Sequence, residues 1–270
     1  MSLVDIGVNL TDKRLERTAV IERAINASVS KMIVTGSSLE SSKEARTIST
    51  QYQNTLYCTA GVHPHHAKEY TEQTTTELRA LTAHPEVVAI GECGLDFNRN
   101  FSTPTEQLYA FEQQLQLACD LKLPVFLHER DAFDEQIKLL KQYRTGLVGG
   151  VAHCFTGSSE QMAAYLDLDL YIGITGWFCD PKRGQALREA IPSLPLKNLL
   201  LETDAPYLRP KGLANNRKLD KGNNEPAYLP YIAAELANLM EIEQQELQQA
   251  SYYNTCKLFP KIEAGIESEY

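Results

Sequence analysis

Short apolar runs alternate with amphipathic stretches along most of the chain. Residues 87–91 are typical, because four apolar residues and a glycine lead directly into the acid Glu92. A buried strand is expected to reach polar residues where the chain leaves the core. The runs that predict strands are residues 3–8, 31–37, 56–62, 87–91, 124–127, 147–152, 170–175 and 199–202. The stretches that predict helices are residues 18–27, 39–52, 74–83, 104–121, 132–142, 160–166, 184–191, 226–239 and 242–259.

The order of these elements predicts a closed α/β barrel. Eight strand-like runs followed by helices fit the (β/α)8 TIM barrel, which usually has about 250 residues, and the chain has 270. No linker rich in proline or serine interrupts the series. We therefore predict one domain spanning residues 1–270, with its core at about residues 3–260. A doubly wound open sheet is the main alternative.

Four of the predicted strands end in side chains that can bind a metal ion. Glu92, His128, His153 and Asp204 follow the runs 87–91, 124–127, 147–152 and 199–202, respectively, closely in each case. In a barrel the carboxyl ends of all strands open on one face, so these residues should converge. Two imidazoles and two carboxylates suit Zn²⁺, Mn²⁺ or Mg²⁺. Glu92 is placed to bridge two ions, and Asp204 to bind metal or to accept a proton from water.

Each of these residues also has an ordinary structural interpretation. A single histidine at the end of a strand is most often a hydrogen-bonded structural residue. The combination of two histidines and two acids at equivalent strand ends favours metal binding.

Three further residues are candidates for binding substrate. His63 and His65 end the run 56–62, and contact with a substrate phosphate is favoured over metal ligation for both. Arg130 lies two residues beyond His128 and is within reach of a phosphate on the same face. An ion pair of Arg130 with Glu129 or Asp131 is the competing interpretation.

Aromatic residues also follow the predicted strand ends. They predict either packing at the rim of the core or a platform on which nucleobases stack. Neither interpretation is favoured for Phe155 and Trp177. The full set is Phe97, Phe101, Phe155, Trp177, Phe178 and Tyr207.

The charge distribution limits how the chain could contact nucleic acid. A net charge of −9 argues against a broad basic surface that coats DNA or RNA. A local basic segment remains, because residues 209–221 carry five cations and one acid.

Composition and cysteine usage indicate a cytoplasmic globular protein. No apolar segment approaches the roughly 20 residues needed to span a bilayer, and the first residues lack the pattern of a signal peptide. The six cysteines are scattered without a CxxC pair, which predicts reduced thiols. Cys93 and Cys154 adjoin Glu92 and His153, and packing is favoured for them over metal ligation.

Six ordered motifs resemble those of the TatD family of metal-dependent deoxyribonucleases, which are relatives of the amidohydrolase barrels. The resemblance implies a TIM barrel and a divalent-metal phosphodiesterase, with Glu92, His128, His153 and Asp204 at the metal centre. The Asn224-Glu225-Pro226 triplet is a further family mark. The motifs are Gly61-Val62-His63-Pro64-His65, Gly91-Glu92-Cys93-Gly94-Leu95-Asp96, Pro124-Val125-Phe126-Leu127-His128, His153-Cys154-Phe155-Thr156-Gly157, Tyr171-Ile172-Gly173 and Glu202-Thr203-Asp204-Ala205-Pro206-Tyr207.

The chain departs from the family pattern at one place. Most members carry an HxH pair at the end of the first strand, where this chain has Gly7 and Asn9. Glycine offers no ligand, and an asparagine amide offers one neutral oxygen. We therefore expect the ion nearest this strand to be held weakly, with one or two ions in total. The member that gave the family its name shares this loss, and it is the member that the chain resembles most closely.

That resemblance implies a 3′–5′ exonuclease that acts on the ends of single-stranded DNA and RNA and takes part in DNA repair. Mg²⁺ is the expected cofactor, with Mn²⁺ and Zn²⁺ as alternatives. In the predicted mechanism a water molecule attacks a terminal phosphodiester bond and Asp204 accepts the proton of that water. Glu92 takes part as a ligand of the metal. His63, His65, Arg130 and the basic segment 209–221 hold the strand. We expect a monomer that does not bind membranes.

Two other functions are compatible with the same residues. The metal centre could hydrolyse an ester, an amide or an aminoacyl-tRNA bond, because barrels support many chemistries. The chain could also be a non-catalytic nucleic-acid-binding protein that has lost turnover together with the HxH pair.

Overall fold

The computed structural model describes residues 2–212 and 222–262. Within these residues eight parallel strands pair in chain order, from β1 beside β2 to β7 beside β8. A parallel bridge between Val8 and Ala205 joins the first strand to the segment after the last. The strands are β1 (Leu3–Val8), β2 (Val29–Val34), β3 (Leu56–Ala60), β4 (Val87–Asp96), β5 (Val125–Arg130), β6 (Gly150–Ala152), β7 (Tyr171–Ile174) and β8 (Leu199–Leu201). The predicted (β/α)8 TIM barrel is confirmed.

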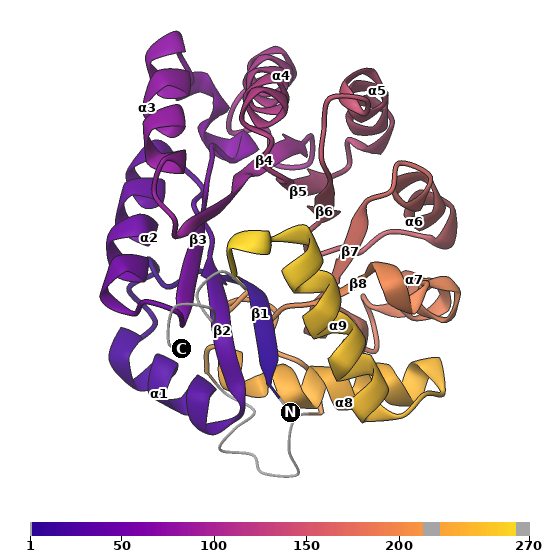
Figure 1. Cartoon of the computed structure of the whole chain (residues 1–270). Coiled ribbons are helices and arrows are strands. Elements are labelled where there is room, and N and C mark those ends of the chain that lie inside the picture. The colour runs from indigo at the N-terminus through magenta and orange to yellow at the C-terminus, as the bar shows by residue number, and fades with distance from the viewer. Residues whose placement is uncertain (1, 213–221, 263–270) are drawn as a thin grey trace.

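Helices surround the strands as an outer ring (Figure 1). Several begin at capping boxes, as at Thr103, whose hydroxyl accepts from the Glu106 amide while the Glu106 carboxylate accepts from the Thr103 amide at 2.7 Å. The α-helices are α1 (Arg17–Asn26), α2 (Leu39–Gln51), α3 (Glu72–Thr82), α4 (Pro104–Leu121), α5 (Phe133–Tyr143), α6 (Ser159–Leu166), α7 (Gln185–Ala190), α8 (Leu229–Met240) and α9 (Gln244–Leu258). Short 3₁₀ helices are η1 (Pro64–Glu69), η2 (Gly176–Cys179), η3 (Ile191–Ser193), η4 (Leu196–Asn198), η5 (Pro226–Tyr228) and η6 (Pro260–Ile262).

Three strands differ from their predicted bounds in ways that affect the site. The prediction ended strand five at residue 127, but β5 continues to Arg130, so His128 lies within the strand. The prediction ended strand four at Gly91, but β4 continues to Asp96 and pairs with β5 throughout its second half. The pattern predicts that the chain leaves the core at Glu92, yet Glu92 is buried, as is Asp96 further along the strand, and both have polar partners there. Strand six is shorter than predicted, because Val148 is exposed and pairing begins at Gly150.

The core has two parts, one between the strands and the helices and one inside the barrel. The inner cluster combines alternate strand residues such as Val4 and Phe126 with Phe259 and Ile262 from the end of the described chain. Lys261 donates to the carbonyl of Val87, the first residue of β4, at 2.7 Å. The segment after α9 therefore closes the amino ends of the strands, and the carboxyl ends open on the opposite side. Figure 1 views the molecule from the side that α9 covers.

Within the described residues, no helix combines the length and the apolar character needed to cross a bilayer.

Candidate metal centre

A bulge in β4 places the Glu92 side chain at the carboxyl end of the barrel. Gly91 pairs with Phe126 and Cys93 with Leu127, so Glu92 is an extra residue between two successive pairs. Its amide donates to the Gly36 carbonyl at 2.8 Å, on the β2 side. Gly91 has φ +140°, and a Cβ there would collide with the Phe126 backbone. Only glycine fits this close approach of β4 to β5.

Three imidazoles surround one oxygen of Glu92. Oε1 lies 3.1 Å from His128 Nδ1, 3.4 Å from His153 Nε2 and 3.5 Å from His63 Nε2. Ligand atoms of His63, Glu92 and His128 all lie within 4.8 Å of one another. The structure thus brings together three of the four residues predicted to form the metal centre, and adds His63 to them.

The charge of Glu92 is stabilised by these neighbours. Burial opposes its ionisation, but the electrostatic effect of the nearby His63 and the hydrogen bonds from His128 and His153 outweigh burial and hold the pKa of Glu92 well below its ordinary value. Burial also opposes protonation of His128, but its contacts with Asp96 and Glu92 prevail and raise its pKa to about 9. The cluster therefore holds an ionised Glu92 carboxylate that accepts hydrogen bonds from histidine nitrogens.

Asp96 lies on the far side of His128 and links it to His65. Its Oδ2 is 2.8 Å from His65 Nε2 and 3.6 Å from His128 Nε2. The His128 Nε2 atom is buried and has no hydrogen-bond partner within the described residues. A metal that displaces the ring proton would find a buried nitrogen without a partner beside a carboxylate, and nitrogen and oxygen ligand atoms fit the metals predicted from the sequence.

His63 is in reach of the cluster but is poorly prepared to bind metal. Its Nδ1 accepts a hydrogen bond from the His65 amide at 3.1 Å. Burial lowers the pKa of His63 well below its ordinary value, so the ring is neutral and its one proton lies on Nε2. That proton faces Glu92, which favours a donor role over ligation. Substrate contact stays the prediction for His63 and for His65.

Asp204 follows β8 and is held by the end of β1. Its amide donates to the Gly7 carbonyl at 2.8 Å, and Asn9 Nδ2 donates to its Oδ1 at 2.9 Å. Burial raises the pKa of Asp204 to about 7, with Glu92 and Glu202 raising it further and His153 opposing them. The charges of this carboxylate and of the cluster are therefore coupled.

Glu202 is a residue that the sequence did not single out. It is 0% exposed, its Oε2 lies 2.7 Å from His153 Nδ1, and its Oε1 accepts from the Cys154 amide. The sequence held two signals, an acid inside the last apolar run two residues before Asp204 and the place of this acid at the start of the sixth family motif, but neither indicated a role for it. A buried acid of that kind requires a partner.

The predicted substrate residues and aromatics divide by exposure. Arg130 is exposed and forms no ion pair with Glu129 or Asp131 in the part of the chain that the structure describes.

The predicted aromatic residues differ in how they are packed. Phe155 is buried against Tyr165, with ring centroids 6.1 Å apart, so it packs in the core and is not a stacking platform. Of the remaining aromatics, Trp177 is half-buried with the Arg183 guanidinium 4.4 Å from its ring, and Phe97 is also half-buried. Phe178 is buried, whereas Phe101 and Tyr207 are exposed.

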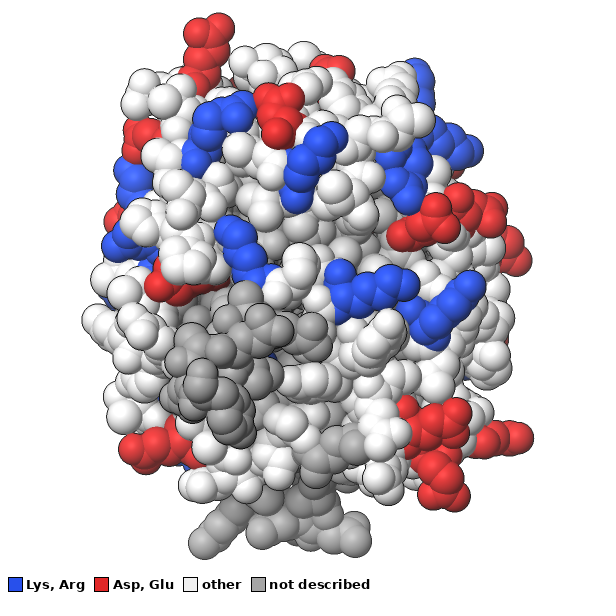
Figure 2. Space-filling model, in the orientation of Figure 1, with Lys and Arg blue, Asp and Glu red and all other residues white. Residues whose placement is uncertain are grey.

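The basic segment 209–221 is only partly described, since residues 213–221 lie outside the described residues. Arg209 lies 5.2 Å from the Tyr228 ring. On the face seen from the α9 side, basic and acidic side chains are interspersed among neutral ones (Figure 2). On this face the basic side chains of the described residues therefore form no broad continuous surface.

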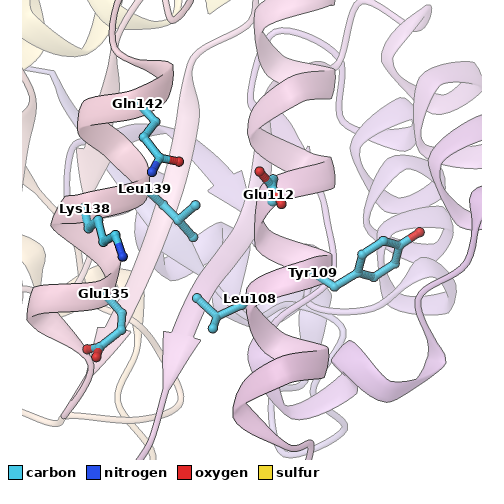
Figure 3. Close-up of a pocket in the computed structure, with 7 residues that line it drawn as sticks. All are labelled: Leu108, Tyr109, Glu112, Glu135, Lys138, Leu139 and Gln142. Carbon is cyan, nitrogen blue, oxygen red and sulfur yellow. The ribbon is translucent and has the colours of Figure 1, made fainter.

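A groove of about 360 Å³ lies between α4 and α5, away from the cluster (Figure 3). Its lining residues belong to the outer helices, and none of them is a member of the His and carboxylate cluster. They are Leu108, Tyr109, Glu112, Glu135, Lys138, Leu139 and Gln142. The groove is therefore not the candidate site.

A parallel eight-stranded barrel with histidines and carboxylates gathered at its carboxyl end has the architecture of a metal-dependent hydrolase. Residues 4–260 match the family described as TatD related DNase. The chain belongs to this family, which confirms the resemblance seen in the motifs.

Relatives of high similarity share nearly the whole chain. The 3′–5′ ssDNA/RNA exonuclease TatD of Citrobacter rodentium is 48% identical over 95% of this chain and 97% of its own length. The enzyme of the same name from Salmonella typhimurium is 46% identical over 95% of this chain and 98% of its own. A crystal structure of a TatD homologue from Escherichia coli superposes with a TM-score of 0.86 at 30% identity, covering 96% of this chain and 98% of the homologue.

Proposed function

We propose that this chain is a divalent-metal-dependent exonuclease that removes nucleotides from the 3′ ends of single-stranded DNA and RNA. The observation that carries the proposal is the set of three imidazoles within 3.5 Å of one Glu92 oxygen, at the mouth of a barrel of the TatD family. Relatives 46–48% identical over 95% of the chain bear the name of that activity.

Glu92, His128, His153 and Asp204 are the residues proposed to hold the metal. Their nitrogen and oxygen donors fit Mn²⁺ and Zn²⁺ well, whereas Mg²⁺ prefers oxygen ligands and retained water. Mg²⁺ stays the prediction from the resemblance, with one or two ions. When bound, the ion polarises the phosphoryl oxygen and makes water more acidic.

The chain's own residues then supply proton transfer and positioning. Asp204, whose pKa is raised to about 7 chiefly by burial, accepts a proton from the attacking water at its carboxylate. Asn9 holds that carboxylate in place at 2.9 Å. Arg130 donates to the phosphates of the strand, and His63 and His65 stay the further predicted contacts that align it for in-line attack. A role in DNA repair, a cytoplasmic location and a monomeric state stay predictions.

A time course on end-labelled single-stranded DNA and RNA, with Mg²⁺, Mn²⁺ or Zn²⁺ in turn, tests the proposal. We expect stepwise shortening from the 3′ end that stops with EDTA and is lost in Glu92→Gln and Asp204→Asn. Arg144→Ala is the matched control, because Arg144 pairs with Asp169 at 3.0 Å and has no contact with the cluster. Full activity in either acid variant would contradict the assignment.

A parallel assay on ester and aminoacyl-tRNA substrates separates the main alternative. Metal-dependent hydrolysis of those bonds without shortening of oligonucleotides would replace the exonuclease by another hydrolase. Binding of oligonucleotides without turnover under all three metals would support a non-catalytic protein.

A further inference from the structure

We propose that Glu202 is a positioning residue that fixes the ring orientation and the tautomer of His153. The inference rests on the proposed metal centre and adds a residue that supports it from behind. Glu202 does not touch the cluster oxygen of Glu92. It acts through His153, whose two ring nitrogens contact the two acids from opposite sides, Glu202 at 2.7 Å and Glu92 at 3.4 Å.

The hydrogen bonds of Glu202 leave only one arrangement for a neutral His153. A carboxylate offers acceptors alone, so His153 donates from Nδ1 to Oε2. Nε2 faces the Glu92 carboxylate at 3.4 Å, and when a metal takes the place of a proton there, the Nδ1–H bond to Glu202 leaves the lone pair of Nε2 directed into the cluster, which is the form that binds a metal. His63 lacks this support, since its Nδ1 accepts from a backbone amide. His153 is thus better prepared as a ligand than His63.

The barrel leaves room for the Glu202 carboxylate between two glycines. A Cβ at Gly7 in β1 would lie 2.5 Å from Oε2, and a Cβ at Gly173 in β7 would lie 2.5 Å from Oε1. Both strands must therefore carry glycine for the carboxylate to keep its place. The His153 ring also stacks on the ring of Phe126, with centroids 4.6 Å apart and an angle of 30° between the ring planes.

Glu202→Gln tests the inference because glutamine has one acceptor oxygen, whereas the carboxylate has two. Only one of the two partners of Glu202, the Cys154 amide and His153 Nδ1, can then donate to it. The Cys154 amide donates to one carboxylate oxygen, so the glutamine oxygen should take that position. Its NH₂ group then faces His153 Nδ1 and drives the ring proton to Nε2, where it blocks metal binding. We expect the affinity for Zn²⁺ and Mg²⁺, measured by calorimetry, to fall roughly 10- to 100-fold.

A second readout reports the tautomer without any activity assay. In ¹⁵N spectra of the zinc-loaded protein, the protonated nitrogen of His153 should be Nδ1 in the wild type and should change in Glu202→Gln. Asp5→Asn is the control, because Asp5 is another carboxylate that is 0% exposed, and it bonds Thr203 and Gly7 without touching His153. It should keep the wild-type affinity.

Gly7→Ala is a second variant, for use if Glu202→Gln does not fold. Its methyl group crowds Oε2 while the charge of the carboxylate stays, and it should also weaken metal binding. Thermal unfolding without metal shows which variants are folded.

Three outcomes would overturn the inference. One is wild-type affinity and an unchanged Nδ1 proton in folded Glu202→Gln, or in Gly7→Ala where Glu202→Gln does not fold. Another is an equal loss of affinity in Asp5→Asn, which would mean that Glu202 only stabilises the fold. A wild-type protein that binds neither metal would overturn the proposed metal centre and this inference with it.

Discussion

The side-chain amide of Asn9 donates to the Asp204 carboxylate at 2.9 Å and to the Ala205 carbonyl at 3.2 Å, which joins the end of β1 to the segment after β8. Both hydrogens of the amide are thereby used. The sequence predicted only that this position, which holds a histidine in most family members, offers a metal ion one neutral amide oxygen and so holds it weakly. In this chain Asn9 instead supports the carboxylate proposed to accept the proton.

Asn9→Ala should lower kcat about tenfold with little change in KM, because a hydrogen bond to a charged group is worth about 1.5 kcal/mol or more. Steady-state kinetics on a single-stranded oligonucleotide measure both constants. The matched control is Asn198→Ala, whose amide donates to the Leu170 carbonyl at 3.1 Å at the amino end of β8. Equal losses of kcat in the two variants would show that Asn9 has no special relation to Asp204.

Glu92→Ala should cost more activity than His128→Ala or His153→Ala. Removing Glu92 takes the shared carboxylate from three imidazoles, whereas removing one histidine leaves the carboxylate and the other ligands in place. We expect the loss in kcat/KM for Glu92→Ala to exceed the roughly 10- to 100-fold typical of a residue that only supports a ligand. Parallel assays with circular dichroism as a folding control measure the order, and a histidine variant that is the most impaired would reverse it.

Much of the fold was predictable because its signals are local. Apolar runs and helix starts such as Thr103 with Glu106 depend on neighbouring residues only, and the barrel topology follows from their order. The gathering of Glu92, His128 and His153 was predictable for the same reason, since each directly follows an apolar run of its own. Their roles as ligands stay predictions.

What could not be predicted depends on contacts between distant strands. The bulge at Glu92 needs the close approach of β4 to β5, and the extension of β4 to Asp96 needs the partners that satisfy buried acids. The link of Glu202 to His153 joins residues 49 positions apart. The pattern of apolar residues does not predict such pairs. Buried polar side chains find their hydrogen-bond partners only when the strands have closed into a barrel.

Arg130→Ala should raise KM for single-stranded DNA several-fold and leave kcat nearly unchanged. Arg130 is exposed at the end of β5 without an ion pair in the part of the chain that the structure describes, so its charge is available to a phosphate. The effect should shrink as salt rises, because a phosphate contact depends on ionic strength. Kinetics at two salt concentrations measure this, with Arg144→Ala as the control. An unchanged KM at low salt would remove Arg130 from the substrate site.

Asp5 should make the folded protein less stable as the pH rises towards 8. Burial raises the pKa of Asp5 from 3.8 to about 7, although its hydrogen bonds with Thr203 and Gly7 oppose the shift. Between these two values the folded state keeps the proton that the unfolded state releases, so the stabilisation present below pH 3.8 is lost as the pH rises through about 7. Asp5→Asn cannot ionise and should not show this loss.

The free energy of unfolding of Asp5→Asn relative to the wild type should therefore increase between about pH 4 and pH 8, by up to roughly 4 kcal/mol. Urea unfolding in EDTA at several pH values measures the difference. Asp180→Asn is the control, because backbone hydrogen bonds from Arg183 and Lys182 lower the pKa of Asp180 to about 2, so it stays ionised over most of this range. A difference between Asp5→Asn and the wild type that does not change with pH would show that Asp5 is ionised in the folded protein.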